Sequence, residues 1–388
     1  MTPFGAVHPA RRPSSPYPGP MAAIAFPSPM PSDLVTLPPQ PPGVEYPTHQ
    51  WPAGSPAGAD EIRLRTEINR AFAEPNEPTG GSSLGQSLAL VVVQGGRIVA
   101  ERYHPESSPS ELLVSWSMAK SFTHALLGIL VHQGRFPAHL GPAPIAAWAD
   151  DDRAAITTAQ LLEMRSGLQW VEEYEENDDG ALTDVLEMLF GVGAEDMAAY
   201  AAGKPLDHPP GELYYYSSGT TNLVSRLITD AVSDPGSSIA EQESAVRRFM
   251  ADELFGPLGM SSADPRFDRS GTFVGSSFLY ATARDFARFG LLHLRDGVWD
   301  GRRILPEGWV DDARRPLSVE PDSLNWYSRH WWVYPCTHGS FRASGYEGQV
   351  IVVVPGLDLV IVRLGKTPFE NGADPLFSHL AELIACFE

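Results

Sequence analysis

Two kinds of apolar pattern predict where strands and helices lie in this chain. Residues 87–103 ("SLALVVVQGGRIVAERY") and 349–365 ("QVIVVVPGLDLVIVRLG") each contain two β-rich apolar runs around a Gly-Gly or Pro-Gly pair. Such runs around a turn pair predict two hairpins. Apolar residues at helical spacing indicate helices near 59–73, 282–294 and 375–387. The middle one begins at Thr282 with a pattern like a capping box.

The order of these elements predicts the fold class. Strands lie at both ends of the chain, and mostly helical pattern lies between them. We therefore expect a fold of the α+β or α/β class. One antiparallel sheet is built from both chain ends and flanked by helices. The predicted domains are an α/β domain from 59–135 and 265–388, and an inserted, mainly helical domain at 136–264. Residues 1–58 are rich in proline, so we expect them to be extended or disordered and exclude them from the fold.

Charge and cysteine content exclude several functions. The chain has 388 residues, with 28 basic against 48 acidic side chains and a formal charge of −20, which repels phosphate backbones and anionic membranes. We therefore expect neither nucleic acid nor membrane as a partner. Cys336 and Cys386 are too few for a disulfide framework, and no cysteine or histidine has metal-ligand spacing. We predict no metal and no cofactor. The lack of a bilayer-spanning run or signal-like start predicts a cytoplasmic protein.

One serine lies in a G-x-S-x-G pattern, "GSSLG", with Ser83 at its centre. In α/β-hydrolases such a serine follows a strand and precedes a helix. Here a loop-like segment precedes Ser83 and the apolar run follows it. We therefore do not expect Ser83 to be a nucleophile.

A second serine has the surroundings that nucleophilic chemistry requires. In "SWSMAKSFTHALLGIL", residues 115–130, Ser117 and Lys120 are three residues apart at the head of an apolar helical face. A desolvated lysine has a lowered pKa and can help a serine hydroxyl to lose its proton. A capping serine with a surface lysine fits the same spacing. Only three lysines occur, at 120, 204 and 366, among many arginines, which favours an amine that can be deprotonated.

A tyrosine cluster offers a second reactive group. The stretch "PPGELYYYSSGTTNLVSRLI", residues 209–228, sets three tyrosines and small polar residues ahead of an apolar helix. A phenol near a lysine ammonium can ionise and act as a general base. A packing edge of a strand is the alternative interpretation.

Together these stretches resemble the serine β-lactamase and penicillin-binding-protein superfamily, in its class C-like branch. That branch includes β-lactamase-like carboxylesterases and 6-aminohexanoate-dimer hydrolases. The resemblance covers about 85–388, and it implies a β-lactamase-like fold and hydrolase activity. Further stretches that carry it are "ITTAQLLEMRSGLQW", "LFGPLGM", "YATARDFARFGLLHLRDGVWDGRRILPEGWV" and "ASGYEGQVIVVVPGLDLVIV".

The resemblance assigns roles to the first two motifs. Ser-x-x-Lys makes Ser117 the nucleophile and Lys120 its basic partner. Tyr-x-Asn falls on the tyrosine cluster, where the spacing to the next helix selects Tyr216 as the general base; Tyr215 takes its place if the loop shifts by one residue. Ser218 stands where the family has asparagine, which weakens the case for holding a β-lactam side chain.

The third motif of the family, Lys- or His-Thr-Gly, corresponds to Ala343-Ser344-Gly345. The family uses the missing cation to hold a carboxylate, so its loss argues against β-lactam or peptidoglycan chemistry. The resemblance implies that the backbone N–H groups of Ser117 and Tyr346 form the oxyanion hole. It also implies that Ser218, Ser344 and Gly345 contact substrate.

Aromatic and acidic residues near these motifs leave two interpretations open. Trp170 and Trp331 correspond to segments that border the pocket in the family, but aromatic residues are as often part of a core. The acidic run at 172–179 ("EEYEENDD") is typical of a solvated loop. The alternative is a pocket rim that favours cationic substrates.

The sequence therefore predicts a serine hydrolase that cleaves an ester or amide bond of a small molecule through an acyl-enzyme. Two alternatives remain. One is a D-alanyl carboxypeptidase or β-lactamase, and the other is a non-catalytic binding protein that retains the fold.

Overall fold

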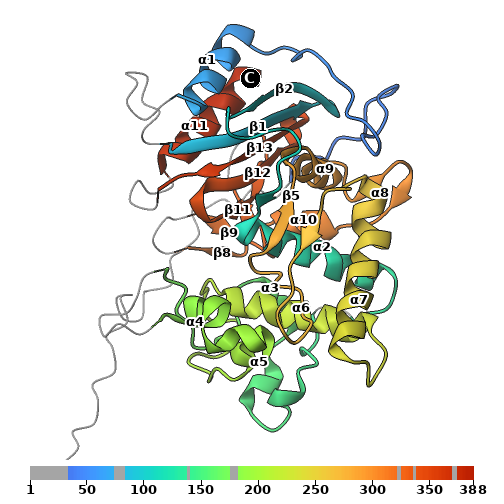
Figure 1. The fold of residues 1–388 in the computed structure, drawn as a ribbon, viewed down its shortest axis with the longest axis vertical. Helices are drawn as coiled ribbons and strands as arrows, with labels where there is room; N and C mark the ends of the chain where they lie inside the picture. The colour runs from blue at the N-terminus through green and yellow to red at the C-terminus, as the bar shows by residue number, and fades with distance from the viewer. Residues whose placement is uncertain are drawn as a thin grey trace, which may run out of the picture. The chain divides into compact units, whose positions relative to one another are not determined.

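The computed structural model describes residues 34–73, 84–137, 140–174, 182–320, 325–334, 338–368 and 374–388. Within these ranges, eight strands form one antiparallel sheet in the order β2-β1-β13-β12-β11-β10-β9-β8 (Figure 1). The strands are β1 (Gln86–Gln94), β2 (Arg97–Tyr103), β8 (Ser318–Val319), β9 (Trp326–Tyr327), β10 (Trp332–Val333), β11 (Phe341–Gly345), β12 (Gln349–Val354) and β13 (Leu359–Lys366). Both predicted hairpins are confirmed. Because β1 pairs with β13, the sheet joins the two ends of the chain, as predicted.

The central strands are continuously apolar because both faces of the sheet are covered. Leu90 and Val92 of β1 face α1 (Glu61–Ala71) and α11 (Asp374–Ile384) in one core cluster. Val91 and Val93 point to the opposite face and join a second cluster with α2 (Ala119–His132) and α9 (Ala283–Leu294). Successive valines therefore stabilise two different layers. The helices predicted near both ends of the chain and at 282–294 are confirmed.

Within the described residues, six further α-helices follow one another between α2 and β4. In Figure 1, α3 to α6 lie below the sheet, whereas α7 and α8 lie to the right. This segment is therefore mainly helical, and the inserted domain predicted for 136–264 stays a prediction. The helices are α3 (Thr158–Leu162), α4 (Asp184–Phe190), α5 (Met197–Ala202), α6 (Ser218–Val232), α7 (Ile239–Met250) and α8 (Gly256–Leu258). The remaining elements are β3 (Leu113–Val114), β4 (Asp264–Pro265), β5 (Leu279–Ala281), β6 (Val298–Trp299), β7 (Arg302–Arg303) and α10 (Trp309–Arg314).

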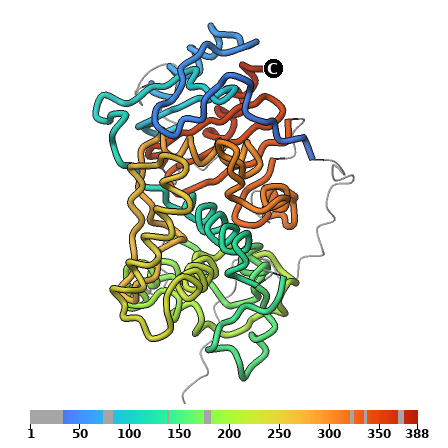
Figure 2. The backbone as a smooth tube through the Cα atoms, turned by 90° about the vertical axis from the view of Figure 1, so that its right-hand side faces the viewer, coloured from blue at the N-terminus to red at the C-terminus, as the bar shows by residue number. Residues whose placement is uncertain are grey.

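Residues 34–58 contain turns and one isolated β-bridge but no helix or strand, and excluding them from the fold was wrong. This segment, which is blue in Figure 2, packs on the α/β part of the chain. Arg288 donates a hydrogen bond to the carbonyl of Pro47 at 2.7 Å, and the indole of Trp299 donates to Thr48 at 2.8 Å. Trp51 is only 9% exposed. Single side chains and backbone carbonyls make these contacts, so no apolar periodicity marks them.

Two features are absent from the described residues. None of these helices is both long and apolar enough to cross a bilayer. Across the same ranges, no group of three or more His, Cys, Asp or Glu side chains is placed to hold a metal ion.

Candidate active site

Ser117 lies in a single 3₁₀ turn, Trp116–Met118, directly before α2. The sequence predicted a helix that begins close to this serine, and the α-helix itself begins at Ala119. Ser115 anchors the turn, because its hydroxyl donates to the carbonyl of Ser277 at 3.2 Å and accepts from the N–H of Leu279 at 3.1 Å. The turn is therefore fixed to the segment that leads into β5.

Lys120 is buried in the first turn of α2, where it is 1% exposed. Its Nζ lies 2.9 Å from the Oγ of Ser117, 3.0 Å from the Oγ of Ser218 and 3.0 Å from the carbonyl oxygen of Ser276. Burial lowers the pKa of Lys120 to about 8, and the negative charge of Glu172 partly opposes this shift. A surface lysine is therefore excluded, and the amine can lose its proton near neutral pH.

Glu172 holds the Ser218 side of this network. Its carboxylate accepts the backbone N–H of Ser218 at 2.7 Å, the Ser218 hydroxyl at 2.5 Å and the indole N–H of Trp170 at 2.6 Å. The pKa of Glu172 lies above its usual value, because burial raises it more than the charge of Lys120 and these hydrogen bonds lower it. Three donors on one carboxylate favour its ionised form.

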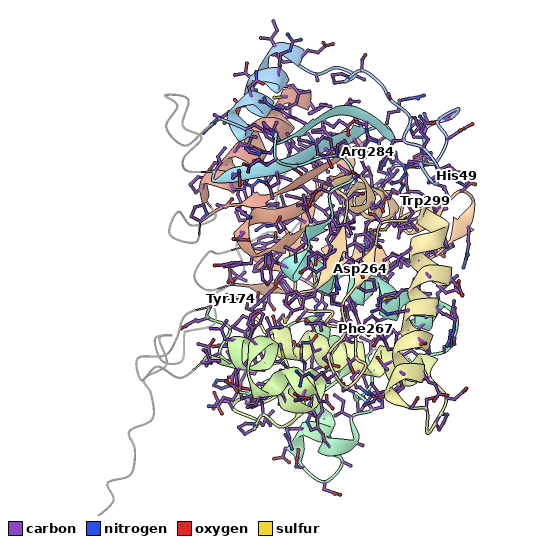
Figure 3. All side chains as sticks on the ribbon, in the orientation of Figure 1. His49, Tyr174, Asp264, Phe267, Arg284 and Trp299 are labelled. Atoms are coloured by element: carbon purple, nitrogen blue, oxygen red, sulfur yellow. The ribbon has the colours of Figure 1, made fainter. Side chains whose placement is uncertain are left out.

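Two phenols approach the serine. The ring of Tyr216 lies 4.8 Å from the Nζ of Lys120 and stacks on Trp332 at 5.7 Å between ring centroids. Of the three adjacent tyrosines, it is Tyr216 whose ring lies over the lysine. Tyr174, from the segment before α4, lies between the sheet and that helix in Figure 3. Burial raises the pKa of both phenols above their usual range, while hydrogen bonding with Ser117 lowers it in each.

The end of β11 lies against the serine turn. A Cβ atom at Gly345 would lie 2.3 Å from the carbonyl oxygen of Ser115 and 3.1 Å from the backbone nitrogen of Ser117, so only glycine fits there. The side-chain amide of Gln349 donates to the carbonyl of Tyr346 at 3.1 Å and to that of Gly365 at 2.6 Å. The Gln349 side chain therefore fixes the peptide that follows Tyr346.

Three other residues that were predicted to contact substrate make contacts within the protein. Trp331 is 0% exposed and packs on Phe341 at 5.1 Å between ring centroids, which favours the core interpretation of this residue over the pocket one. Trp170 is 4% exposed and lies behind Glu172, to which it donates. Ser344 accepts a hydrogen bond from Arg342 at 2.9 Å. Ser83 lies outside the described residues.

Three residues of the site were missed in the sequence: Glu172, Tyr174 and Ser276. The solvated-loop interpretation of the acidic run is wrong for Glu172, and residues 175–179 lie outside the described ranges. A signal was present, because Trp170, Glu172 and Tyr174 alternate with period two, which places side chains on one face of an extended segment.

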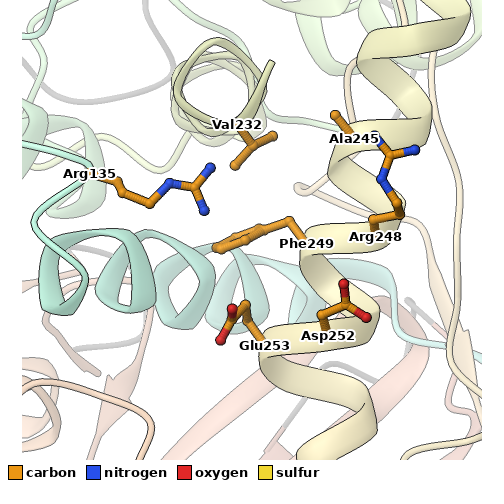
Figure 4. A pocket seen from close by; sticks show the side chains of 7 residues that line it. All are labelled: Arg135, Val232, Ala245, Arg248, Phe249, Asp252 and Glu253. Carbon is orange, nitrogen blue, oxygen red and sulfur yellow. The ribbon is translucent and has the colours of Figure 1, made fainter. Parts of the chain in front are cut away.

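A hollow elsewhere on the surface is lined by residue 135 and residues between 232 and 253 (Figure 4). Its walls are apolar and charged side chains of both signs, and none of them is a serine, cysteine or threonine. It is therefore a poor candidate for nucleophilic chemistry, in contrast to the surroundings of Ser117.

The antiparallel sheet, the flanking helices and the Ser-x-x-Lys turn are those of a β-lactamase-like hydrolase. Comparison with known proteins agrees: a family model described as Beta-lactamase matches residues 81–383, so the chain belongs to that family. The 6-aminohexanoate-dimer hydrolase of Paenarthrobacter ureafaciens is 24% identical over an alignment of 315 positions that covers 72% of each chain.

Solved structures share the fold. A Bacillus anthracis protein assigned as a 6-aminohexanoate-dimer hydrolase is 22% identical, with a TM-score of 0.68 and 88% of each chain covered. A family VIII carboxylesterase is 15% identical, with a TM-score of 0.60, over 86% of this chain and 98% of the other. The predicted superfamily and fold class are therefore confirmed.

Proposed function

We propose that this protein is a serine hydrolase that cleaves a carboxylic ester or amide bond through an acyl-enzyme. The Oγ of Ser117 attacks the carbonyl carbon, and its proton passes to Lys120. The tetrahedral intermediate collapses, and the leaving group takes up a proton as it departs. Water then attacks the carbonyl carbon of the acyl-enzyme, the same groups transfer its proton, and the carboxylic acid is released from Ser117.

The hydrogen-bond directions around Lys120 carry this proposal. The carbonyl of Ser276 can only accept, so one N–H of Lys120 points to it at 3.0 Å. The hydroxyl hydrogen of Ser218 is donated to Glu172, so its oxygen accepts a second N–H at 3.0 Å. A neutral amine has two N–H groups and one lone pair. In that state the lone pair faces the Oγ of Ser117 at 2.9 Å, which is the geometry of a base.

Tyr216 acts in this scheme as a neutral phenol. From the sequence we expected it to ionise beside Lys120 and act as the general base. Burial raises its pKa well above the usual value, which favours the protonated phenol. We therefore assign the base role to Lys120 and a relay role to Tyr216, whose hydroxyl can accept one proton while it donates another to the leaving group.

An oxyanion hole from the backbone N–H groups of Ser117 and Tyr346 completes the mechanism. Its support is the close approach of Gly345 to the nitrogen of Ser117, because the N–H of Tyr346 belongs to the peptide that follows Gly345. Such donors stabilise the charge that develops on the carbonyl oxygen.

Two observations favour an ester or amide of ordinary reactivity over a β-lactam. A relative that is 24% identical, with 72% of each chain covered, is a 6-aminohexanoate-dimer hydrolase. Ala343, where the superfamily carries a cation, is 1% exposed and faces the core. A charged side chain could not be placed there without a large desolvation cost.

The test is covalent labelling with a small fluorophosphonate, followed by peptide mass spectrometry. We expect the label on Ser117, with no labelling and no esterase activity in Ser117→Ala. Ser110→Ala, a change at an exposed serine nearby, serves as the matched control and retains both. A label at another residue, or full activity in Ser117→Ala, would contradict the proposal.

A further inference from the structure

Four aromatic rings form a continuous row that begins beside Ser117. Tyr346 and Trp116 have their ring centroids 5.8 Å apart, Trp116 and Phe278 5.7 Å, and Phe278 and Phe190 6.3 Å. The four residues come from four separate segments of the chain, so the row is a product of the tertiary fold. We call these four residues the aromatic strip.

The strip is open to solvent at its far end. Phe190, the last residue of α4, is 61% exposed, and the other three rings are partly buried. Beside it, Val192 is 77% exposed. Exposed apolar side chains that gather at one site on the surface often mark a ligand-binding surface.

The near end of the strip joins the reactive group. Trp116 is bonded to Ser117 through the peptide chain, and Tyr346 supplies a backbone N–H to the proposed oxyanion hole. The indole N–H of Trp116 donates to Glu347 at 3.4 Å, so its polar atom has a partner and its ring is left for apolar contact. A substrate carbonyl at Ser117 would therefore place one of its substituents on these rings.

We propose that the aromatic strip binds an extended apolar group of the substrate, an alkyl chain or an aromatic group, attached to the ester or amide that Ser117 cleaves. This inference rests on the proposed function. The strip offers flat apolar contact and no cation to pair with a carboxylate among its four side chains. Substrates with a long neutral substituent are therefore preferred to those with a short or anionic one.

Two ester series test the inference. One varies the acyl group of p-nitrophenyl esters from acetate to octanoate, and the other varies the alcohol of acetate esters from ethanol to octanol. Full burial of a methylene changes kcat/KM by about fourfold. On a partly open strip we expect kcat/KM to rise by about two- to fourfold per methylene in one of the two series. A flat response in both series overturns the inference.

Variants locate the effect. We expect Phe190→Ala and Phe278→Ala each to lower the octyl-to-short ratio of kcat/KM by about fivefold or more in the responsive series, since each removes a ring from the contact. Ile62→Ala is the matched control, because Ile62 is 79% exposed on α1, which covers the opposite face of the sheet. An equal fall of the ratio in Ile62→Ala, or an unchanged ratio in both phenylalanine variants, also overturns it.

Fluorophosphonate labelling of every variant separates the two proposals. If Ser117 is not labelled in the parent protein, the proposed hydrolase function fails. If Ser117 is labelled but kcat/KM does not depend on chain length, or the two phenylalanine variants do not lower the octyl-to-short ratio more than Ile62→Ala does, only the assignment of the aromatic strip fails.

Discussion

Glu172 is the charge that we expect to set the pH at which Ser117 becomes reactive. The carboxylate contacts Ser218, and Ser218 contacts Lys120, through hydrogen bonds of 2.5 and 3.0 Å that share one oxygen. The carboxylate oxygen and the lysine nitrogen are therefore no more than about 5.5 Å apart. A negative charge at that distance stabilises the ammonium form and raises the pKa of Lys120, which burial lowers to about 8.

The substitution Glu172→Gln removes this charge and keeps the shape of the side chain. At 5.5 Å, two unit charges interact by about 3 kcal/mol with an effective dielectric constant of about 20, and by about 0.8 kcal/mol in bulk water. These limits correspond to about 2 and about 0.5 pH units. Because the lost charge favoured the ammonium, the pKa of Lys120 falls, and the neutral amine forms at lower pH.

The assay is the pH dependence of kcat/KM, which reports groups of the free enzyme. In the parent protein we expect the rate to rise with pH around a midpoint near 8, as Lys120 loses its proton. In Glu172→Gln this midpoint moves to lower pH by about 0.5 to 2 units. Glu173→Gln is the matched control, since its side chain is exposed, and it leaves the midpoint in place. A midpoint that stays or rises in Glu172→Gln, or moves as far in Glu173→Gln, would refute the reasoning.

Three further predictions concern the segment after β11 that Gln349 holds, the hydrophobic core, and stability at acid pH. Gln349→Leu removes the side-chain amide that holds Tyr346 and Gly365, so steady-state kinetics should show kcat lower by about 10- to 100-fold with a smaller change in KM; an unchanged kcat contradicts this. Trp331→Ala opens a cavity in the core, and chemical denaturation should show a loss of about 3 to 5 kcal/mol of unfolding free energy, whereas a loss below about 1 kcal/mol would place Trp331 outside the core. Burial lowers the pKa of His293 to about 4, below the unfolded value of about 6.5, so the unfolded state binds the proton first and stability falls as pH drops from about 6.5 to 4. Thermal melts should show a shallower fall in His293→Gln, by roughly 3 kcal/mol at most across that window, and an equal fall in both proteins would be inconsistent with a neutral buried His293.

The parts of the molecule that were predictable depend on local pattern. The two hairpins could be predicted because continuous β-branched runs flank turn residues. Ser117 and Lys120 could be paired because residues three apart share one side of a helix. The glycine at position 345 fitted a motif of the resembling family, and its close contact with the nitrogen of Ser117 gives the physical reason.

The unpredicted parts depend on contacts between distant segments. Ser276 is 156 residues from Lys120 in sequence, and no periodicity connects the two. The burial of Glu172 could not be predicted from the acidic run, because composition describes the average of a segment and not the one side chain that points inward. Trp331 was ambiguous for the same reason, since burial of a single aromatic side chain is decided by its neighbours in space.

The lysine network also makes Ser117, the proposed nucleophile, a reporter of assembly. In an unfolded chain Lys120 has an ordinary pKa near 10.4, and Ser117 is no more reactive than any other serine. Reactivity arises only when the turn before α2, the start of α6 and the segment before β5 come together. On the proposed function, attachment of a fluorophosphonate to Ser117 therefore counts the molecules in which these three segments, remote in sequence, have come together.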